Sequence, residues 1–249
     1  MNDTMSGHSK WHNIQKTKGA QDAKRAAIFT KIAKEMYVAV REGGGSADPA
    51  YNSRLATIIT KAKAANMPND NIKRVLEKAA NAGQGDAYEA ITYEGYGPGG
   101  IAIIVETMTD SRNRTASNVR HHFDKYGGSL GVNGCVSWNF TRKGVLVVDN
   151  EEGNYSEDQV MMDALECGAD DVETEEECFT ILTDPEEFNA VATSLEEKGY
   201  AFASAQIDMI PGEYKTLDKP EDIENMEKML EMFDDDDDVQ NVWHNWERD

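Results

Sequence analysis

A run of apolar residues at helical spacing sets the first constraint on how this chain can fold. Between residues 29 and 40 they fall at the spacing of one face of an α-helix: Phe29, Ile32, Ala33, Met36, Tyr37 and Val40. Such a stripe is stable mainly when it packs against another element. The helix is predicted to end at the three glycines 43–45, since glycine is the common residue just beyond a helix C-terminus.

Two further helices can cover that stripe. The second is predicted to begin at Asp48 and Pro49, a capping residue followed by proline in the first turn, and to end before Pro68. The third is capped by Asn69 or Asp70 and stops near Gly83. We therefore predict a small three-helix bundle from about residue 20 to residue 82.

From Gly83 onward the pattern changes from helical to mixed strand and helix. A glycine-rich turn at 97–100 joins two predicted strands, 91–94 and 101–105, into a hairpin. Short strands interleaved with helices and hairpins are typical of ferredoxin-like α+β domains. The later elements are expected in this order: a helix at 112–126, strands at 135–140 and 145–148, a helix at 157–167, a hairpin at 172–182, a helix at 184–198, a strand at 203–210, a helix at 220–233 and a strand at 239–243.

The last helix and strand lack a sheet of their own. The economical solution is that strand 239–243 pairs in the same sheet as strand 101–105, which makes the middle of the body an insertion. The predicted fold class is multi-domain α and α+β, with an N-terminal three-helix bundle followed by two ferredoxin-like α+β domains, the second inserted into the first. The predicted domains are 1–82, then 83–134 plus 211–249, and the inserted 135–210.

Charge is distributed very unevenly along the chain. Residues 1–81 hold 14 Lys+Arg against 7 Asp+Glu, a net of +7, whereas residues 82–249 hold 11 against 39, a net of −28, and the two sum to the chain's −21. A basic segment on an acidic body points to a polyanionic partner. The acidic body disfavours wrapping nucleic acid over its whole surface, because like charges repel. Contact is therefore expected to be local to the basic segment.

Candidate contact residues lie upstream of the first helix and along it. On a helical wheel the lysines of this helix cluster opposite the apolar stripe, and no acidic residue separates Asp3 from Asp22. Unpaired lysine and arginine gain binding energy by releasing the counterions of phosphates. The predicted nucleic-acid-binding residues are Lys10, Trp11, Lys16, Lys18, Lys24, Arg25, Lys31, Lys34, Arg112 and Arg114.

Two side-chain roles stay open from the sequence. Trp11 is either available to stack on a base or buried as a plug in the bundle core. Arg112 and Arg114 stand at the start of the predicted helix 112–126, where free backbone N–H groups attract an anion. The alternative is a capped helix whose arginines pair with neighbouring acidic residues.

No constellation typical of an enzyme stands out. The glycine-rich residues 93–100 run from strand to strand, whereas a phosphate-binding loop runs from a strand into a helix. The five carboxylates 234–238 lack the ligand spacing of a calcium loop and predict a solvated acidic turn. Cys135, Cys167 and Cys178 match neither a disulfide framework nor a zinc pattern. We predict a non-enzymatic protein with no cofactor and no metal.

Several long stretches resemble the YebC/PmpR family. They are GHSKWHNIQKTKGAQDAKRAAIFTKIAKEM at 7–36, AANMPNDNI at 64–72, YEGYGPGG at 93–100, DSRNRTASNVRHHF at 110–123 and DDVQNVWHNW at 237–246. The resemblance implies a cytoplasmic, non-enzymatic protein of three domains. Members are usually described as DNA-binding transcriptional regulators. Organellar relatives, among them the mitochondrial translational activator of cytochrome c oxidase, act in translation, and bacterial members have been linked to ribosomes stalled at prolines. Residues 1–4 precede the point at which family members would begin.

Two classes of nucleic-acid target follow from these observations. A sequence-reading DNA regulator presents Arg, Asn or Gln to base edges, whereas this bundle offers mostly lysine, which binds phosphate. A factor that binds RNA or the ribosome needs backbone recognition and an aromatic for stacking. The main prediction is a DNA-binding transcriptional regulator, and the alternative is a translation factor associated with rRNA in the ribosome.

Location and assembly are less constrained by the sequence. There is no apolar run approaching the ~18 residues of a membrane span, so no membrane partner is predicted and a cytoplasmic location is expected. The sequence does not give the oligomeric state.

Overall fold

The computed structural model describes residues 22–81 and 88–248. These residues divide into two compact units. The first unit holds 22–81 together with 142–208, and the second unit holds 88–141 together with 209–248. The chain therefore passes from the first unit to the second, returns to the first and ends in the second.

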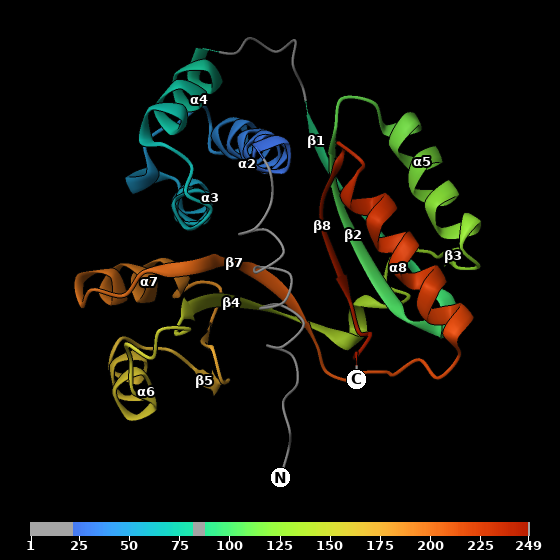
Figure 1. Ribbon diagram of the computed structural model, residues 1–249. Coiled ribbons are helices and arrows are strands. Elements are labelled where there is room, and N and C mark those ends of the chain that lie inside the picture. Colours follow the sequence, from blue (N-terminus) through green and yellow to red (C-terminus); the bar gives the residue numbers. More distant parts are fainter. Residues whose placement is uncertain (1–21, 82–87, 249) are drawn as a thin grey trace. The chain divides into compact units, whose positions relative to one another are not determined.

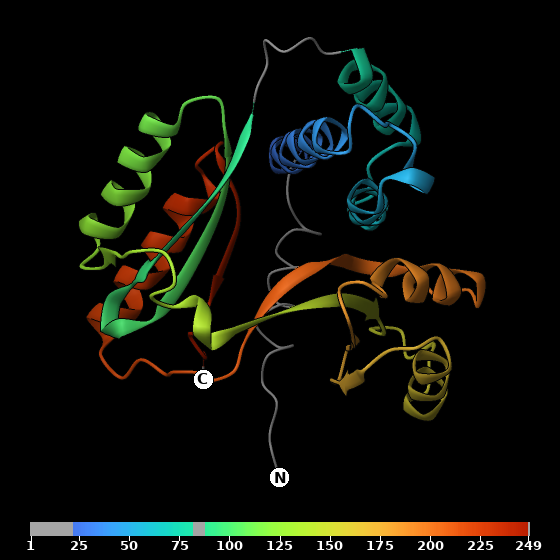
Figure 2. The ribbon, with the colours of Figure 1, turned by 180° about the vertical axis from the view of Figure 1, so that it is seen from behind.

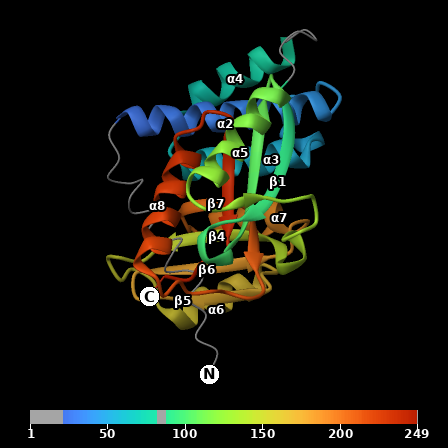
Figure 3. The same ribbon diagram turned by 90° about the vertical axis from the view of Figure 1, so that its right-hand side faces the viewer.

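Three helices open the first unit. They are α2 (Asp22–Glu42), α3 (Ser53–Ala64) and α4 (Asn69–Asn81), and they pack together in Figure 3. Their facing sides share one apolar cluster, because each helix carries apolar residues at helical spacing. Fully or nearly fully buried members of this cluster are Ile32, Met36, Ala39, Val40, Leu55, Ile58, Ala62, Met67, Ile72 and Ala79.

The connection from α2 to α3 differs in one detail from the prediction. Helix α2 ends as expected, with Gly44 and Gly45 at φ 70° and 88°. Asp48 and Pro49, however, start only the short 3-10 turn η1 (Pro49–Tyr51), and α3 begins after Asn52. The Asn52 side chain accepts from the N–H of Leu55 at 3.0 Å and donates to the carbonyl of Ala39 at 2.8 Å. This buried amide caps α3 and ties it to α2, so Asn52 determines the start of the helix.

The rest of the first unit is a four-stranded sheet with two helices. The strand order is β5-β6-β4-β7, and the element order along the chain is strand, helix, strand, strand, helix, strand. Asn189 connects this part to the bundle by donating to the carbonyl of Ser53 and the hydroxyl of Thr57, at 3.2 and 3.0 Å. The elements are β4 (Phe140–Asp149), α6 (Glu157–Glu166), β5 (Asp171–Thr174), β6 (Cys178–Thr183), α7 (Phe188–Glu197) and β7 (Phe202–Pro211).

The second unit is built on a hairpin and completed by the C-terminal segment. Its sheet order is β3-β1-β2-β8, and every neighbouring pair is antiparallel. Helices α5 and α8 lie side by side on one face of this sheet, as Figures 1 and 2 show from opposite sides. The elements are β1 (Glu89–Tyr96), η2 (Pro98–Gly100), β2 (Ala102–Thr109), α5 (Arg112–Lys125), β3 (Ser129–Leu130), α8 (Pro220–Asp234) and β8 (Val239–His244).

The predicted pairing of the C-terminal strand is confirmed. Strand β8 lies beside β2, with Ile104 opposite Trp243 and Val105 opposite Val242. The order of elements in this unit nevertheless differs from the ferredoxin-like order predicted for it, because the hairpin of β1 and β2 precedes the first helix. The core combines both helices and the sheet, and its fully buried members include Ile101, Ile103, Val105, Val119, Phe123, Met226, Met229 and Phe233.

The strand predicted at 135–140 is wrong. Residues 131–136 form a loop that leads into the 3-10 turn η3 (Ser137–Asn139), and β4 then runs without a break from Phe140 to Asp149. The reason is Glu94, whose buried carboxylate accepts from the N–H groups of Gly134, Val136 and Ser137 at 2.8, 3.0 and 2.9 Å. Backbone donors that bond to one carboxylate cannot also pair with a neighbouring strand.

Glu94 gives this loop a pH dependence that can be measured. Burial opposes ionisation of Glu94, but the three backbone N–H donors outweigh it, and the pKa of Glu94 is lowered from its ordinary 4.5. The ionised carboxylate therefore stabilises the loop above about pH 4.5, and this contribution is lost as pH falls through the lowered pKa. We expect the hydrogen-exchange protection of the three amides, corrected for intrinsic rates, to fall below that pH. Glu94→Ala should reduce it about tenfold or more at neutral pH.

An internal control is available for that experiment. The N–H of Gly131 donates to the backbone carbonyl of Glu94 at 2.8 Å, so its protection should change little in Glu94→Ala. Protection of the three carboxylate-bound amides that stays constant in wild type across this pH range would contradict the assigned role of the carboxylate.

Candidate nucleic-acid interface

The structure covers only part of the predicted contact set. Lys10, Trp11, Lys16 and Lys18 lie outside the described residues, and Lys24 belongs to α2 without a description of its side chain. The two roles considered for Trp11 therefore stay predictions. The described part of the bundle, residues 22–81, is basic by itself, with 11 Lys+Arg against 6 Asp+Glu, a net of +5.

The lysine face of α2 is less open than predicted. Arg25 is exposed, but Lys31 and Lys34 are only half-exposed, and both have interaction partners. Val38 lies one turn beyond Lys34 on the same side of the helix and is fully buried, which shows that this side of α2 is covered by other residues. Helix α2 is thus covered on more than its apolar stripe, and the expected row of freely exposed lysines is corrected to one exposed arginine and two half-exposed lysines.

Helix α3 uses its basic residues within the fold. Lys61 donates to the carboxylate of Glu35 at 2.7 Å, and both side chains are largely buried where α3 meets α2. Lys63 lies 3.8 Å from the carboxylate of Glu196. A half-exposed ion pair links Arg54 to Glu42. These cations are already neutralised by carboxylates, so α3 has little unpaired positive charge with which to bind a polyanion.

Helix α4 presents the most accessible positive charge of the bundle. Lys73, Arg74 and Lys78 are exposed, and within the described residues none of them forms an ion pair. Arg74 and Lys78 are four residues apart and therefore point to the same side of the helix. Arg25 and Arg41 of α2 are exposed as well. We call these five residues the exposed cations of the bundle: Arg25, Arg41, Lys73, Arg74 and Lys78.

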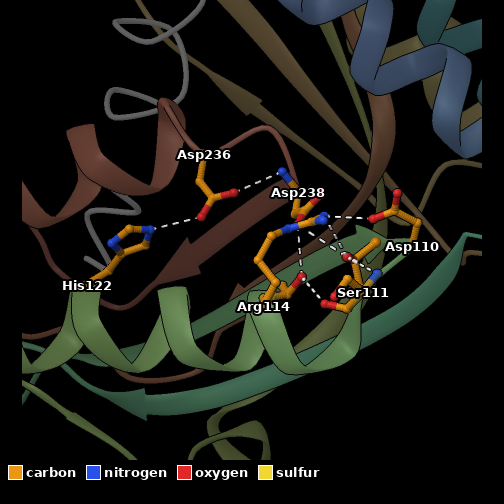
Figure 4. A network of polar contacts seen from close by, with 8 residues as sticks. Asp110, Ser111, Arg114, His122, Asp236 and Asp238 are labelled. Carbon is orange, nitrogen blue, oxygen red and sulfur yellow. Dashed lines mark hydrogen bonds and ion pairs between the residues drawn. The ribbon is translucent and has the colours of Figure 1, made fainter.

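The two candidate arginines at the start of α5 follow the pairing alternative. Arg114 donates to Asp238 at 2.7 Å and to Asp110 at 2.8 Å, as Figure 4 shows, and these hydrogen bonds raise its pKa. Arg112 donates to Glu89 at 3.0 Å across a more exposed surface. Helix α5 therefore begins with its arginines neutralised by carboxylates. Their predicted contact with nucleic acid would require these ion pairs to open.

The acidic run 234–238 is only in part the solvated turn that was predicted, because Asp234, Asp235 and Asp237 are exposed but the other two are not. Asp238 is buried and also accepts from the hydroxyls of Thr109 and Thr115, at 3.2 and 2.9 Å. Asp236 lies 2.9 Å from the ring of His122 on α5, and both side chains are about nine-tenths buried (Figure 4). Because the run connects α8 to β8, these carboxylates hold the C-terminal strand against α5 and β2.

One exposed feature was missed from the sequence. Val132, in the loop 131–136, and Trp138, in η3, are 78% and 71% exposed. Trp138 falls within the strand predicted at 135–140, which gave no reason to expect it on an exposed turn. A signal was nevertheless present, because residues 126–141 contain no Asp, Glu, Lys or Arg, although 29% of the chain is charged.

Within residues 22–81 and 88–248, no helix has both the length and the apolar character needed to cross a bilayer. The same residues contain no group of three or more His, Cys, Asp or Glu side chains arranged to hold a metal ion.

Comparison with known proteins finds matches over nearly the whole chain. Residues 9–82 match a family described as the TACO1/YebC protein N-terminal domain, and residues 88–246 match one described as the TACO1/YebC second and third domain. Proteins from Ruminiclostridium cellulolyticum and Geobacillus kaustophilus, each named a probable transcriptional regulatory protein, are 52% and 54% identical. The first alignment covers 98% of each chain and the second 97% of each.

A solved structure is also similar. The crystal structure of a conserved hypothetical protein from Aquifex aeolicus aligns with a TM-score of 0.80 and 42% identity, over 91% of each chain. A probable transcriptional regulatory protein of Bacillus subtilis is 52% identical, over 97% of this chain and 99% of its own length.

Proposed function

Because the chain belongs to the TACO1/YebC family, we propose that it is a non-enzymatic, nucleic-acid-binding regulator of gene expression that acts on transcription. The names of relatives that are more than 50% identical over nearly their full length support this function. The observation that carries it is the set of exposed cations, which is accessible positive charge on a bundle of net +5 in a chain of net −21. A cytoplasmic location without a membrane partner is part of the proposal.

We propose the following division of labour along the chain. Residues 1–82 form the basic domain that docks on nucleic acid. Residues 83–134 with 211–249 form a discontinuous α+β domain, and 135–210 form the α+β domain inserted into it. The family descriptions, which separate 9–82 from 88–246, support the first boundary.

The mode of contact follows from the chemistry of the exposed cations. Lysine and arginine bind phosphate oxygens and release counterions, which supplies affinity but little sequence information. Cations in an ion pair contribute less, since binding must first break the pair. Lys73, Arg74 and Lys78 are therefore expected to contribute more than Lys61 or Arg114.

A second candidate is a translation factor that binds rRNA in the ribosome. The acidic body favours it, since residues 82–249 carry 39 Asp+Glu against 11 Lys+Arg and would be repelled by a duplex wrapped around them. A surface of this kind suits contact with basic proteins while the bundle binds the RNA backbone. Measuring RNA and DNA side by side separates the two candidates.

The salt dependence of binding tests the proposed function. We expect log K to fall linearly with log salt for a labelled 20-nucleotide RNA and a labelled 20-base-pair DNA. Lys73→Gln/Arg74→Gln should flatten the slope by about 1.4 on single strands and about 1.8 on duplex, two contacts at the usual value per phosphate. Affinity at low salt should fall about tenfold or more for every sequence tested.

The matched control removes the same number of positive charges from the second unit. Arg120→Gln/Lys219→Gln replaces one arginine and one lysine on exposed positions of the second unit and should leave the slope unchanged. Equal flattening by both variants would mean that only net charge matters. Wild-type protein that shows no salt-dependent binding to either probe would overturn the proposed function.

A further inference from the structure

A small aromatic patch stands out on the second unit. Trp138 is 71% exposed, Val132 is 78% exposed and Tyr96 is 38% exposed. Soluble proteins expose single apolar side chains routinely, but a group of large ones gathered at one loop marks an interaction site. We call Trp138, Val132 and Tyr96 the aromatic patch.

The patch is held in a fixed conformation. The three hydrogen bonds from loop amides to the carboxylate of Glu94 anchor the backbone between Val132 and Trp138. Asn139, the next residue, is tied to the opposite segment, because it donates to the carbonyl of Glu213 and accepts from its N–H, at 3.0 and 2.9 Å. An exposed tryptophan on an anchored loop loses little further conformational entropy when a ligand binds.

The polar edges of the two aromatic rings are already satisfied. The hydroxyl of Tyr96 and the indole N–H of Trp138 both donate to the carbonyl of Cys135, each at 2.9 Å. What the rings offer a ligand is therefore their apolar faces, which suits stacking better than hydrogen bonding. A flat partner with its own π-surface fits this chemistry.

The charge around the patch allows an anionic partner to approach. Residues 126–141 contain no charged side chain, whereas the chain as a whole carries 46 Asp+Glu. The carboxylate that the loop amides bind, Glu94, is buried and compensated by its three N–H donors. Repulsion of a phosphate backbone is thus weaker here than over the acidic remainder of the body.

The size of the patch favours a base over a protein surface. Three side chains, of which the largest bury about 150–250 Å² each, supply at most a few hundred Å². A stable protein interface needs about 800 Å² on each partner. A single unpaired base needs only one aromatic face, and such stacking is worth ~1–3 kcal/mol per base.

We propose that the aromatic patch is a second nucleic-acid contact, at which Trp138, with Tyr96 beside it, stacks on an unpaired base. The preferred ligand is then a single-stranded nucleic acid rather than a duplex, because paired bases do not expose their faces. This inference rests on the proposed function, since it assigns a further contact of the same protein to the same class of ligand.

Single-strand and duplex binding of Trp138 variants test the inference. The probes are a labelled 12-nucleotide RNA, a DNA strand of equivalent sequence (T for U) and a 20-base-pair duplex. Trp138→Ala in the full chain should weaken binding to the single strands about tenfold, with an unchanged salt slope, and leave duplex binding unaltered. Trp138→Phe should retain affinity to within about threefold, because a ring face remains. The RNA and DNA arms show which single strand is preferred.

The control is Met162→Ala, which removes an exposed apolar side chain, at 54%, from α6 outside the bundle. It should leave single-strand binding unchanged. Wild-type affinity of Trp138→Ala for both single strands would overturn the inference while the proposed function stands, and would assign the patch to a protein partner. Equal weakening on single strands and duplex would also overturn it. If the wild-type protein binds neither the single strands nor the duplex, the proposed function itself is overturned, and the inference falls with it.

Discussion

Replacing Phe233 by alanine is expected to lower the free energy of unfolding of the second unit by about 3–5 kcal/mol. Phe233 is fully buried near the end of α8, and its ring makes edge-on contacts with Phe123 at 5.3 Å and with His122 at 5.4 Å between centroids. Alanine would leave a cavity between α8 and α5 that the surrounding helices can fill only in part.

Tryptophan fluorescence during urea unfolding measures this effect. Of the four tryptophans in the chain, Trp138, Trp243 and Trp246 belong to the second unit and the fourth is Trp11, so the signal reports mainly on that unit. Phe233→Leu should cost much less because most of the volume is kept. Glu231→Ala, on an exposed position of the same helix, should stay within about 0.5 kcal/mol of wild type. A loss below about 1 kcal/mol in Phe233→Ala would contradict the described packing.

Replacing Asp238 by alanine has the second largest expected effect, a loss of about 2–3 kcal/mol in the same unfolding experiment. The buried carboxylate accepts from Arg114, Thr109 and Thr115 (Figure 4), and alanine leaves these donors without that acceptor. We expect a smaller loss of stability than for a fully buried ion pair, because the Arg114 side chain is 49% exposed and water can reach it.

Two variants sharpen the Asp238 experiment. Asp235→Ala changes an exposed carboxylate of the same acidic run and should alter stability by no more than about 0.5 kcal/mol. Arg114→Ala should lower stability in the same direction as Asp238→Ala and leave nucleic-acid affinity unchanged. Arg114→Ala with wild-type stability and weaker RNA or DNA binding would restore the phosphate-binding alternative for the start of α5.

The elements that were predicted well are those governed by residues close in the sequence. The apolar stripe from Phe29 to Val40 predicted α2, and the glycines at 43–45 predicted its end, because side-chain period and backbone freedom are local properties. The pairing of β8 with β2 also followed from the sequence, since a helix and a strand without a sheet of their own must join an existing one. The difference in net charge between the bundle and the rest of the chain was also known from the sequence, because formal charge depends only on residue type.

The elements that were mispredicted depend on partners distant in the chain. Residues 135–140 have strand-like composition, but Glu94, some 40 residues earlier, accepts their N–H groups and makes them a loop. For the same reason the exposure of Trp138 was missed. The start of α3 moved from Asp48 to Ser53 because the amide of Asn52 bonds to the carbonyl of Ala39 on a different helix.

For the candidate interface, the sequence determined the kinds of side chain and their net charge, while only the tertiary structure decided which of them are available. Lys61, Arg112 and Arg114 look the same in sequence as Lys73 and Arg74, yet the first three meet carboxylates where helices and strands converge and the last two face solvent. The physical reason is that an ion pair acts over a few ångströms, so the charge that a residue presents depends on which acidic side chains the fold brings within that distance.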